Sequence, residues 1–407
     1  MIVLNQEELQ RDIQYQNMIN AITASKHESN DRMSSLRTSK MVSIINSYNF
    51  TSAYKNKSKV AFVGEQFPIE LILALKVIPF NLETMAALLS RSDNLKTYFT
   101  LGDENNLSRD VCSVLRGEFG LGLSNCLPTP DVMVSCNHPC DGYMKIIFNL
   151  QKLYNKRVCS MDVPAVANDV TISYVEAQFR NMAKDIGSEL NIKLEESDLM
   201  EVVNNSNQAK EYYYKTLDMF ENSYLPDVSH ELMMIAMVNL WGSKEIIKVC
   251  KTLYEEALEI REKQKEKKMR KRVIWFGQMS FFSDQIIEYI EKEVEIIYFG
   301  PFVNYRDRIN PENPYRSLAK RFITYSWNPF TMSETIHQFS TKFKISGIIL
   351  QNAWGCRDIL GVNNMLRDAA KENKLKILML DNDFLDKEKV AFDHVKNRID
   401  AFMEILQ

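Results

Sequence analysis

The stretch Asp131-Val132-Met133-Val134-Ser135-Cys136-Asn137-His138-Pro139-Cys140-Asp141-Gly142 joins a short β-type run to a helix. Its apolar run ends at Ser135, two cysteines follow within five positions, and the residues from Asp141 to Tyr154 have helical spacing. A strand that leads directly into a helix is the repeating unit of a parallel α/β sheet. The stretch therefore predicts the fold class and places two thiols after the carboxyl end of a strand.

Similar runs flank this stretch on both sides. Each is short and rich in β-branched or aromatic residues, and helical spacing separates the runs, as over 108–121. Strands that alternate with helices indicate a parallel sheet covered by helices. Residues 56–165 are therefore predicted to form a first Rossmann-like domain, whose other strands lie at 59–63, 77–80 and 157–162.

The rest of the chain divides into three parts. Residues 166–270 contain no convincing strand and are predicted to be a helical insert, which ends in the charged run 262–272. The alternation then restarts, so residues 271–407 are predicted to form a second Rossmann-like domain with a final helix at 390–406. Residues 1–55 are predicted to be an N-terminal helical arm that packs on the body or on another subunit. The strands of the second domain are expected at 273–277, 295–299, 347–350 and 376–380.

The seven cysteines are unevenly placed. Five of them lie between Cys112 and Cys159, and Cys356 stands far downstream, after the predicted strand 347–350. Ligands in open α/β sheets bind beyond the carboxyl ends of the strands, so both domains aim a thiol from a loop that follows a strand. Cys112 lies near the start of a helix, where the helix dipole stabilises a thiolate. This placement favours a metal centre between the two domains.

Other roles for these thiols remain open at this point. Free cysteine is among the most buried residue types, and Cys250 in an amphipathic helix is expected to be core. Disulfides require a secreted chain, and residues 1–8 have neither a basic segment nor a long apolar one. Structural zinc favours repeated pairs of close ligands, and Cys136 with Cys140 is the single close pair.

Composition limits the expected cellular location and the classes of binding partner. The net charge is −3, which gives no reason to expect nucleic-acid binding. Apolar runs are broken by charges, as by Glu65, Glu70 and Lys76, so no membrane span is expected. The protein is expected to be cytoplasmic, where thiols stay reduced and available to metal.

Four segments, in this order and at this spacing, carry a family resemblance: Asp110–Gly120, Pro130–Gly142, Met161–Pro164, and Leu380–Asp386 with Arg398–Phe402. By these segments the chain resembles the iron–sulfur subunits of 2-hydroxyacyl-CoA dehydratases and benzoyl-CoA reductases, including the related double-cubane cluster reductases. The likeness covers roughly residues 55–407.

The resemblance implies a specific function. Subunits of this family hold a [4Fe-4S] cluster by three cysteines and leave one iron open, and the matching positions are Cys112, Cys140 and Cys356. The implied activity is that of the iron–sulfur subunit of an ATP-activated radical 2-hydroxyacyl-CoA dehydratase, which reduces the thioester by one electron to a ketyl radical with loss of water. The implied partners are an ATP-hydrolysing iron–sulfur activator protein, a homologous second subunit or a second copy in a homodimer, and an acyl-CoA substrate.

Three extra thiols keep two further functions open. Cys126, Cys136 and Cys159 lie near the implied ligands, and Cys136 is an alternative to Cys140. All six thiols together would suit the double-cubane [8Fe-9S] cluster of a reductase of small molecules that uses ATP-driven electrons. A third possibility is a non-catalytic electron-transfer or assembly subunit. Core packing is the alternative role for the three extra thiols.

Two carboxylates are candidates for acid–base work. Glu65 follows the first predicted strand and Glu83 follows the second, and Glu83 matches an acidic position of the family near the substrate. A carboxylate there can move the β-proton or orient the hydroxyl; stabilisation of a helix N-terminus is its alternative role. His138, between two cysteines, is expected to bond a cluster sulfur or to line the loop. The sequence has no phosphate-binding loop motif, so ATP is expected to be handled by a partner.

Overall fold

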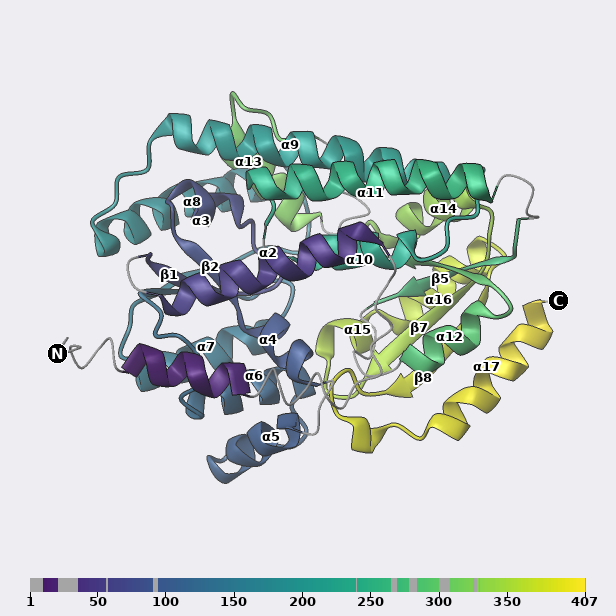
Figure 1. Cartoon of the computed structure of the whole chain (residues 1–407), viewed down its shortest axis with the longest axis horizontal. Helices are drawn as coiled ribbons and strands as arrows, with labels where there is room; N and C mark the ends of the chain where they lie inside the picture. Colours follow the sequence, from purple (N-terminus) through teal and green to yellow (C-terminus); the bar gives the residue numbers. More distant parts are fainter. Residues whose placement is uncertain are drawn as a thin grey trace.

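Two parallel β-sheets form the framework of the chain. The computed structural model describes residues 10–20, 36–55, 58–90, 94–238, 240–264, 269–277, 284–299, 308–324, 328 and 330–406. Each sheet has four strands, all parallel, and helices surround both (Figure 1). The predicted α/β class with two Rossmann-like sheets is therefore confirmed.

The first sheet has the strand order β2-β1-β3-β4. Every residue of β1 and β3 is buried, as expected for central strands with helices on both faces. Its strands are β1 (Val60–Val63), β2 (Ile78–Asn81), β3 (Val132–Cys136) and β4 (Val158–Met161). Its helices are α3 (Glu70–Ala74), α4 (Leu82–Leu89), α5 (Asn94–Glu104), α6 (Ser113–Leu123) and α7 (Asp141–Tyr154).

The second sheet repeats this topology, with the order β6-β5-β7-β8. The sequence order therefore reverses direction between β1 and β3 in one sheet and between β5 and β7 in the other, which are the points where α/β sheets bind ligands. Its strands are β5 (Arg272–Phe276), β6 (Glu295–Phe299), β7 (Ile345–Ala353) and β8 (Lys376–Asn382). Its helices are α12 (Asp284–Glu291), α13 (Pro314–Ile323), α14 (Met332–Phe343), α15 (Arg357–Gly361), α16 (Asn363–Glu372) and α17 (Phe392–Leu406).

Helices alone form the described part of the segment between the sheets. They are α8 (Asp169–Leu190), α9 (Glu196–Asp218), α10 (Val228–Met237) and α11 (Lys244–Lys263), with the 3-10 turn η1 (Met219–Glu221). The long helices α9 and α11 pack side by side, in teal at the top of Figure 1. The two sheets fall within the ranges 56–165 and 271–407, while the domain boundaries themselves stay a prediction. Residues 265–268 of the charged run lie outside the described residues.

The described part of the N-terminal arm packs on the body. Residues 10–20 are helical, and α2 (Arg37–Tyr54) contacts α11 and β2. The buried carboxylate of Glu256 on α11 accepts hydrogen bonds from the backbone N–H groups of Arg37, at 2.6 Å, and Thr38, at 3.0 Å. These donors are among the orphan groups at a helix start, so Glu256 caps α2 from another element. Residues 1–9 and 21–35 of the predicted arm lie outside the described residues.

Two predicted boundaries are wrong, each for a local reason. The helix predicted over 108–121 begins only at Ser113, because Ser108 Oγ accepts the backbone N–H of Asp110 at 3.2 Å and favours a turn. The strand predicted over 347–350 runs instead from Ile345 to Ala353. Its polar side chains find partners across the sheet, as Asn352 Nδ2 donates to Asp381 Oδ1 at 2.9 Å. Among the described residues, no helix is long and apolar enough to cross a membrane.

A buried ion pair connects the two α/β parts through the helical segment. The fully buried Glu70 on α3 accepts two hydrogen bonds from the Arg321 guanidinium on α13, at 2.7 and 2.6 Å, and one from Ser206 on α9 at 2.8 Å. Burial alone would raise the pKa of Glu70, but Arg321 and Lys210 outweigh burial and hold that pKa below its ordinary value. Three parts of the chain therefore share one charged contact.

Arg321→Met should destabilise the chain strongly, because it leaves Glu70 ionised and without its bidentate partner in the interior. Breaking a buried pair from one side costs about 3–5 kcal/mol, which a urea unfolding curve would show as a lower midpoint. Lys215→Met is the matched control, since it removes an exposed i,i+4 pair with Glu211 and should leave the midpoint in place. Equal midpoints for both variants would contradict this role of Glu70.

Candidate cysteine and carboxylate site

The three predicted ligand cysteines share one structural position. Cys112, Cys140 and Cys356 are the residues immediately before α6, α7 and α15. Backbone N–H groups at a helix start favour a thiolate and any anionic group nearby. None of the three thiols makes a capping hydrogen bond. The pKa is raised for Cys112 and Cys140, and of the three it is lowered only for Cys356.

Cys112 and Cys356 are in contact, although they come from different α/β parts. The two thiols interact with each other. This interaction, with burial adding to the rise, holds the pKa of Cys112 well above its ordinary value, and it lowers the pKa of Cys356. The two thiols of the pair are therefore unequal in acidity.

Gly355 makes this contact possible. Its φ of +76° lies in the left-handed region. A Cβ at this position would lie 2.6 Å from the Cys112 backbone nitrogen and 2.7 Å from the Asp110 carbonyl oxygen. Only a residue without a side chain lets the loop after β7 reach the start of α6.

Cys140 lies beside this pair. Burial raises the pKa of its thiol to about 12, and charge on Cys356 raises that pKa further. An ion pair joins the two helix starts concerned, because Arg357, the first residue of α15, donates to Asp141, the first residue of α7, at 2.7 Å. The structure thus brings together all three predicted cysteines.

Among the described residues, no group of three or more His, Cys, Asp or Glu is arranged to hold one metal ion. The chemistry of the donor set is that of three thiols, each directly before a helix. Thiolates are the ligands that hold iron–sulfur clusters, in which they bind different iron atoms.

Both predicted carboxylates lie beside the cysteines. Glu83, in the first turn of α4, accepts a short hydrogen bond from the Glu65 backbone N–H. Burial raises the pKa of Glu83 to about 8, and negative charge on Glu65 and then Cys356 adds to the rise. A carboxylate stabilised mainly by a helix dipole would shift in the opposite direction, so Glu83 has the properties of a protonated acid at neutral pH.

Sequence reasoning missed two residues of this site. Glu118 on α6 is fully buried, and the charges of Glu83 and Glu65 raise its pKa after burial itself. The ring of Tyr143 on α7 fills the space left by Gly64, where a Cβ would lie 2.9 Å from the ring, and its hydroxyl donates to the Val134 carbonyl at 3.4 Å. A charged residue among the apolar positions of α6 was the available signal for Glu118.

The remaining four thiols have different surroundings. The Cys136 thiol donates to the His138 carbonyl at 2.9 Å, and its pKa is raised to about 12 by burial, with Glu83 adding to the rise. Cys126 instead contacts Tyr98, at 3.6 Å, and Cys159 lies near Arg157. Cys250 is buried in α11, as expected for core.

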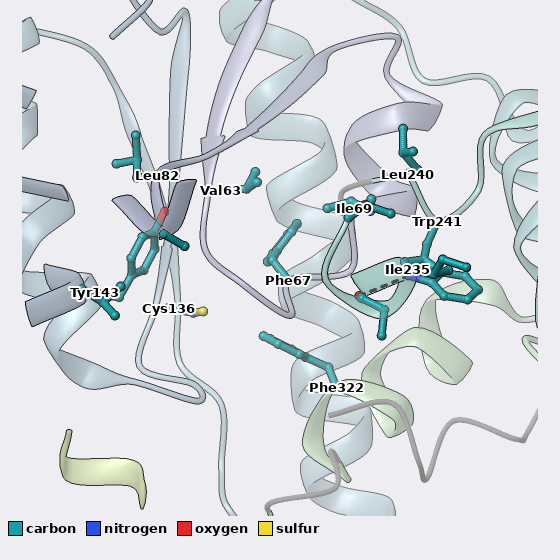
Figure 2. Close-up of a cluster of buried hydrophobic side chains, with 14 of the residues drawn as sticks. Val63, Phe67, Ile69, Leu82, Cys136, Tyr143, Ile235, Leu240, Trp241 and Phe322 are labelled. Atoms are coloured by element: carbon teal, nitrogen blue, oxygen red, sulfur yellow. Dashed lines mark hydrogen bonds between the residues drawn. The ribbon is translucent and has the colours of Figure 1, made fainter. Parts of the chain in front are cut away.

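An aromatic cluster adjoins the site. The ring of His138 packs edge-on against Phe322 at 4.9 Å, and burial lowers the pKa of His138 to about 4. Figure 2 shows Cys136 and Tyr143 on one side of a buried cluster that continues through Phe67 and Phe322 to Trp241. The His138 ring therefore packs against the aromatic cluster, through Phe322.

Comparison with known proteins shows which family the chain matches. Residues 66–406 match the family model described as 2-hydroxyglutaryl-CoA dehydratase, D-component. The chain is 23% identical over 216 residues to the (R)-phenyllactyl-CoA dehydratase alpha subunit of Clostridium sporogenes, covering 50% of this chain and 53% of that protein. It is 24% identical over 230 residues to the (R)-2-hydroxyisocaproyl-CoA dehydratase alpha subunit of Clostridioides difficile, covering 51% and 54%. The matches span about half the length of these relatives. Since the family model covers most of the sequence, the chain belongs to the 2-hydroxyglutaryl-CoA dehydratase D-component family.

Proposed function

We propose that this chain is the iron–sulfur subunit of an ATP-activated radical 2-hydroxyacyl-CoA dehydratase. The observation that carries the proposal is the meeting of Cys112, Cys140 and Cys356 at three helix starts, beside the buried acid Glu83. The three thiols would hold a [4Fe-4S] cluster. The family membership supports the substrate class, and both relatives named above are dehydratases of 2-hydroxyacyl-CoA thioesters.

The reaction explains why such a cluster is required. The β-proton of a 2-hydroxyacyl thioester is not acidic, so ordinary elimination fails. A cluster held by Cys112, Cys140 and Cys356 would supply a Lewis-acidic iron and one electron for the thioester carbonyl, which would allow the hydroxyl to leave, and it would take the electron back after the β-proton has left, so that the dehydration is redox neutral. The chain's own part is to exclude water and to move protons.

Glu83 suits the proton transfers. At neutral pH its carboxyl holds a proton, because its pKa is raised to about 8. It can give that proton to the departing hydroxyl, which leaves as water, and its carboxylate can then accept the β-proton once that proton has become acidic. Glu65, whose backbone N–H holds the Glu83 carboxylate, would position it. The proton count of Glu83 is restored at the end of each cycle.

The partners are proposed on the same grounds. The electron must arrive at a very negative potential, and the sequence has no phosphate-binding loop, so we assign ATP hydrolysis to a separate iron–sulfur activator protein. The relatives are named alpha subunits, which supports a homologous second subunit or a homodimer. We expect the protein in the cytoplasm, where thiols stay reduced.

The two other functions have weaker support. A double-cubane reductase would use six thiols, but Cys126 and Cys159 have different neighbours from the three ligand candidates. A purely electron-transferring subunit gives no role to the buried carboxyls beside the thiols. The dehydratase proposal accounts for both the thiols and the acids.

A small cavity adjoins Glu65. It has a volume of about 30 Å³, and Phe67, Tyr213, Tyr214 and Trp241 contribute aromatic walls. That volume holds about one water molecule. An acyl group that entered from the Glu65 side would require these side chains to move.

Cys140→Ser should lose most of the bound iron, because it removes one of three proposed thiolate ligands. Iron and acid-labile sulfide counted per chain after anaerobic purification would measure the loss. Cys250→Ser is the control, since Cys250 is buried in α11 away from the proposed site, and it should keep its iron. Full iron retention in Cys140→Ser would count against Cys140 as a ligand.

Gly355→Ala should also lower iron content, although it changes no ligand. The added Cβ would clash with the start of α6 and force Cys356 away from Cys112. The control is Gly361→Ala, because a Cβ there would have open space around it. Normal iron content in Gly355→Ala would show that the loop after β7 has room to move.

Dehydration of a 2-hydroxyacyl-CoA should require the activator, ATP and a strong reductant together. The reason is that the ketyl radical is a high-energy species whose electron cannot come from binding energy. The measurement compares turnover with each component left out in turn. Sustained turnover with none of them would exclude the radical mechanism and favour ordinary hydro-lyase chemistry.

A further inference from the structure

Glu118 is a buried acid that the proton cycle of Glu83 does not use. It lies on α6, six residues after Cys112, with no solvent exposure. Neither of its carboxyl oxygens has a hydrogen-bond partner among the residues that the structure describes. An unpaired carboxylate in the interior costs several kcal/mol, so such a group is held as a neutral acid. Its O–H is then a donor for which the described part of the chain supplies no acceptor.

The groups around Glu118 favour the same protonation state. Glu83 on α4 and Glu65 after β1 bring negative charge near Glu118 when they are ionised. On α7, the titratable neighbour of Glu118 is Tyr143. From α5, Leu95 and Phe99 pack on the face of α6 that carries Gly117. Burial, followed by the charges of Glu83 and Glu65, raises the pKa of Glu118 well above its ordinary range.

The cation on the same helix is engaged elsewhere. Arg116 donates to the Asp103 carboxylate at 3.1 Å and lies 3.8 Å from Asp386, with its guanidinium over the ring of Phe99. Arg116 therefore serves a contact between α5, α6 and the segment after β8. Glu118 keeps its proton in the absence of a neutralising contact from this side chain.

A purely structural role would be poorly served by this residue. An apolar side chain of similar size would fill the same space without the cost of burying an unpaired polar group. Buried acids that stay neutral are useful where a site must donate a hydrogen bond to an oxygen that gains negative charge. When the surroundings of two acids in one site push their pKa values apart, one acid can exchange protons while the other keeps its proton and donates a hydrogen bond.

We propose that Glu118 is a second catalytic acid of this site, whose protonated carboxyl donates a hydrogen bond to an oxygen of the bound 2-hydroxyacyl thioester. Glu83 exchanges protons with the substrate, while Glu118 keeps its proton and stabilises negative charge. The bound thioester supplies the acceptor that Glu118 lacks in the free chain. This inference rests on the proposed function.

Two variants separate the hydrogen bond from the packing. Glu118→Gln keeps an N–H donor of the same shape, whereas Glu118→Met removes the donor and keeps the volume. Thioester affinity is measured calorimetrically without activator, so that no turnover occurs, using 2-hydroxy-4-methylpentanoyl-CoA as the titrant. Losing one buried hydrogen bond should weaken binding about 3–10-fold in Glu118→Met, and Glu118→Gln should stay within about twofold of the wild type.

Infrared spectroscopy provides a readout that needs no activity. The unmodified chain at neutral pH should show the C=O stretching band of a protonated carboxylic acid that is missing in Glu118→Gln, and saturating thioester should shift that band. Wild-type affinity in Glu118→Met, equal weakening in both variants, or a band that does not respond to thioester would each overturn the proposal. Failure of the wild type to bind the thioester would instead refute the proposed function, and this inference with it. Urea midpoints confirm that both variants fold.

Discussion

The direction of the strands is the constraint on which the site depends. In a parallel sheet all strands end at one edge, and each following helix begins there. The two sheets share one strand order. Cys140 and Cys356 follow β3 and β7, and Glu65 and Glu83 follow β1 and β2, whereas Cys112 lies at the start of α6, after α5. The contact between Arg357 and Asp141 joins helix starts that are 216 residues apart in sequence. No local stretch could assemble three thiols in this way.

Burial beside other carboxyl groups is the second property of the site. Glu83 and Glu118 are both desolvated and both face carboxyl groups, so each is biased toward its neutral form. Arg116 and Arg357, which lie nearby in sequence, are already paired with aspartates. The same low-dielectric surroundings strengthen every hydrogen bond that a ligand makes there.

Sequence patterns were sufficient for the framework, because central parallel strands are continuous apolar runs and their spacing from helices is local information. These patterns failed for residues whose conformation or burial depends on contacts with elements distant in the sequence. Gln351 and Asn352 lie beyond the predicted strand 347–350, yet they belong to β7 because they pair with Leu380 and Asp381 of β8. Glu118 was missed because α6 is covered by α4, α5 and α7, which local spacing on α6 does not reveal. The proximity of Cys140 and Cys356 was predicted from strand ends, but the role of Gly355 required the positive φ.

The Glu70–Arg321 pair bears on how the chain can be divided. By its sequence pattern the protein looks modular, with two similar α/β parts that invite separate expression. A fragment that stopped before α13 would keep Glu70 but lose its guanidinium partner Arg321. A fragment that began after α11 would keep Arg321 but lose the Glu70 carboxylate. Each half would thus have to rearrange its own interior around one unpaired charge. The two halves share a strand order, and the Glu70–Arg321 pair links them.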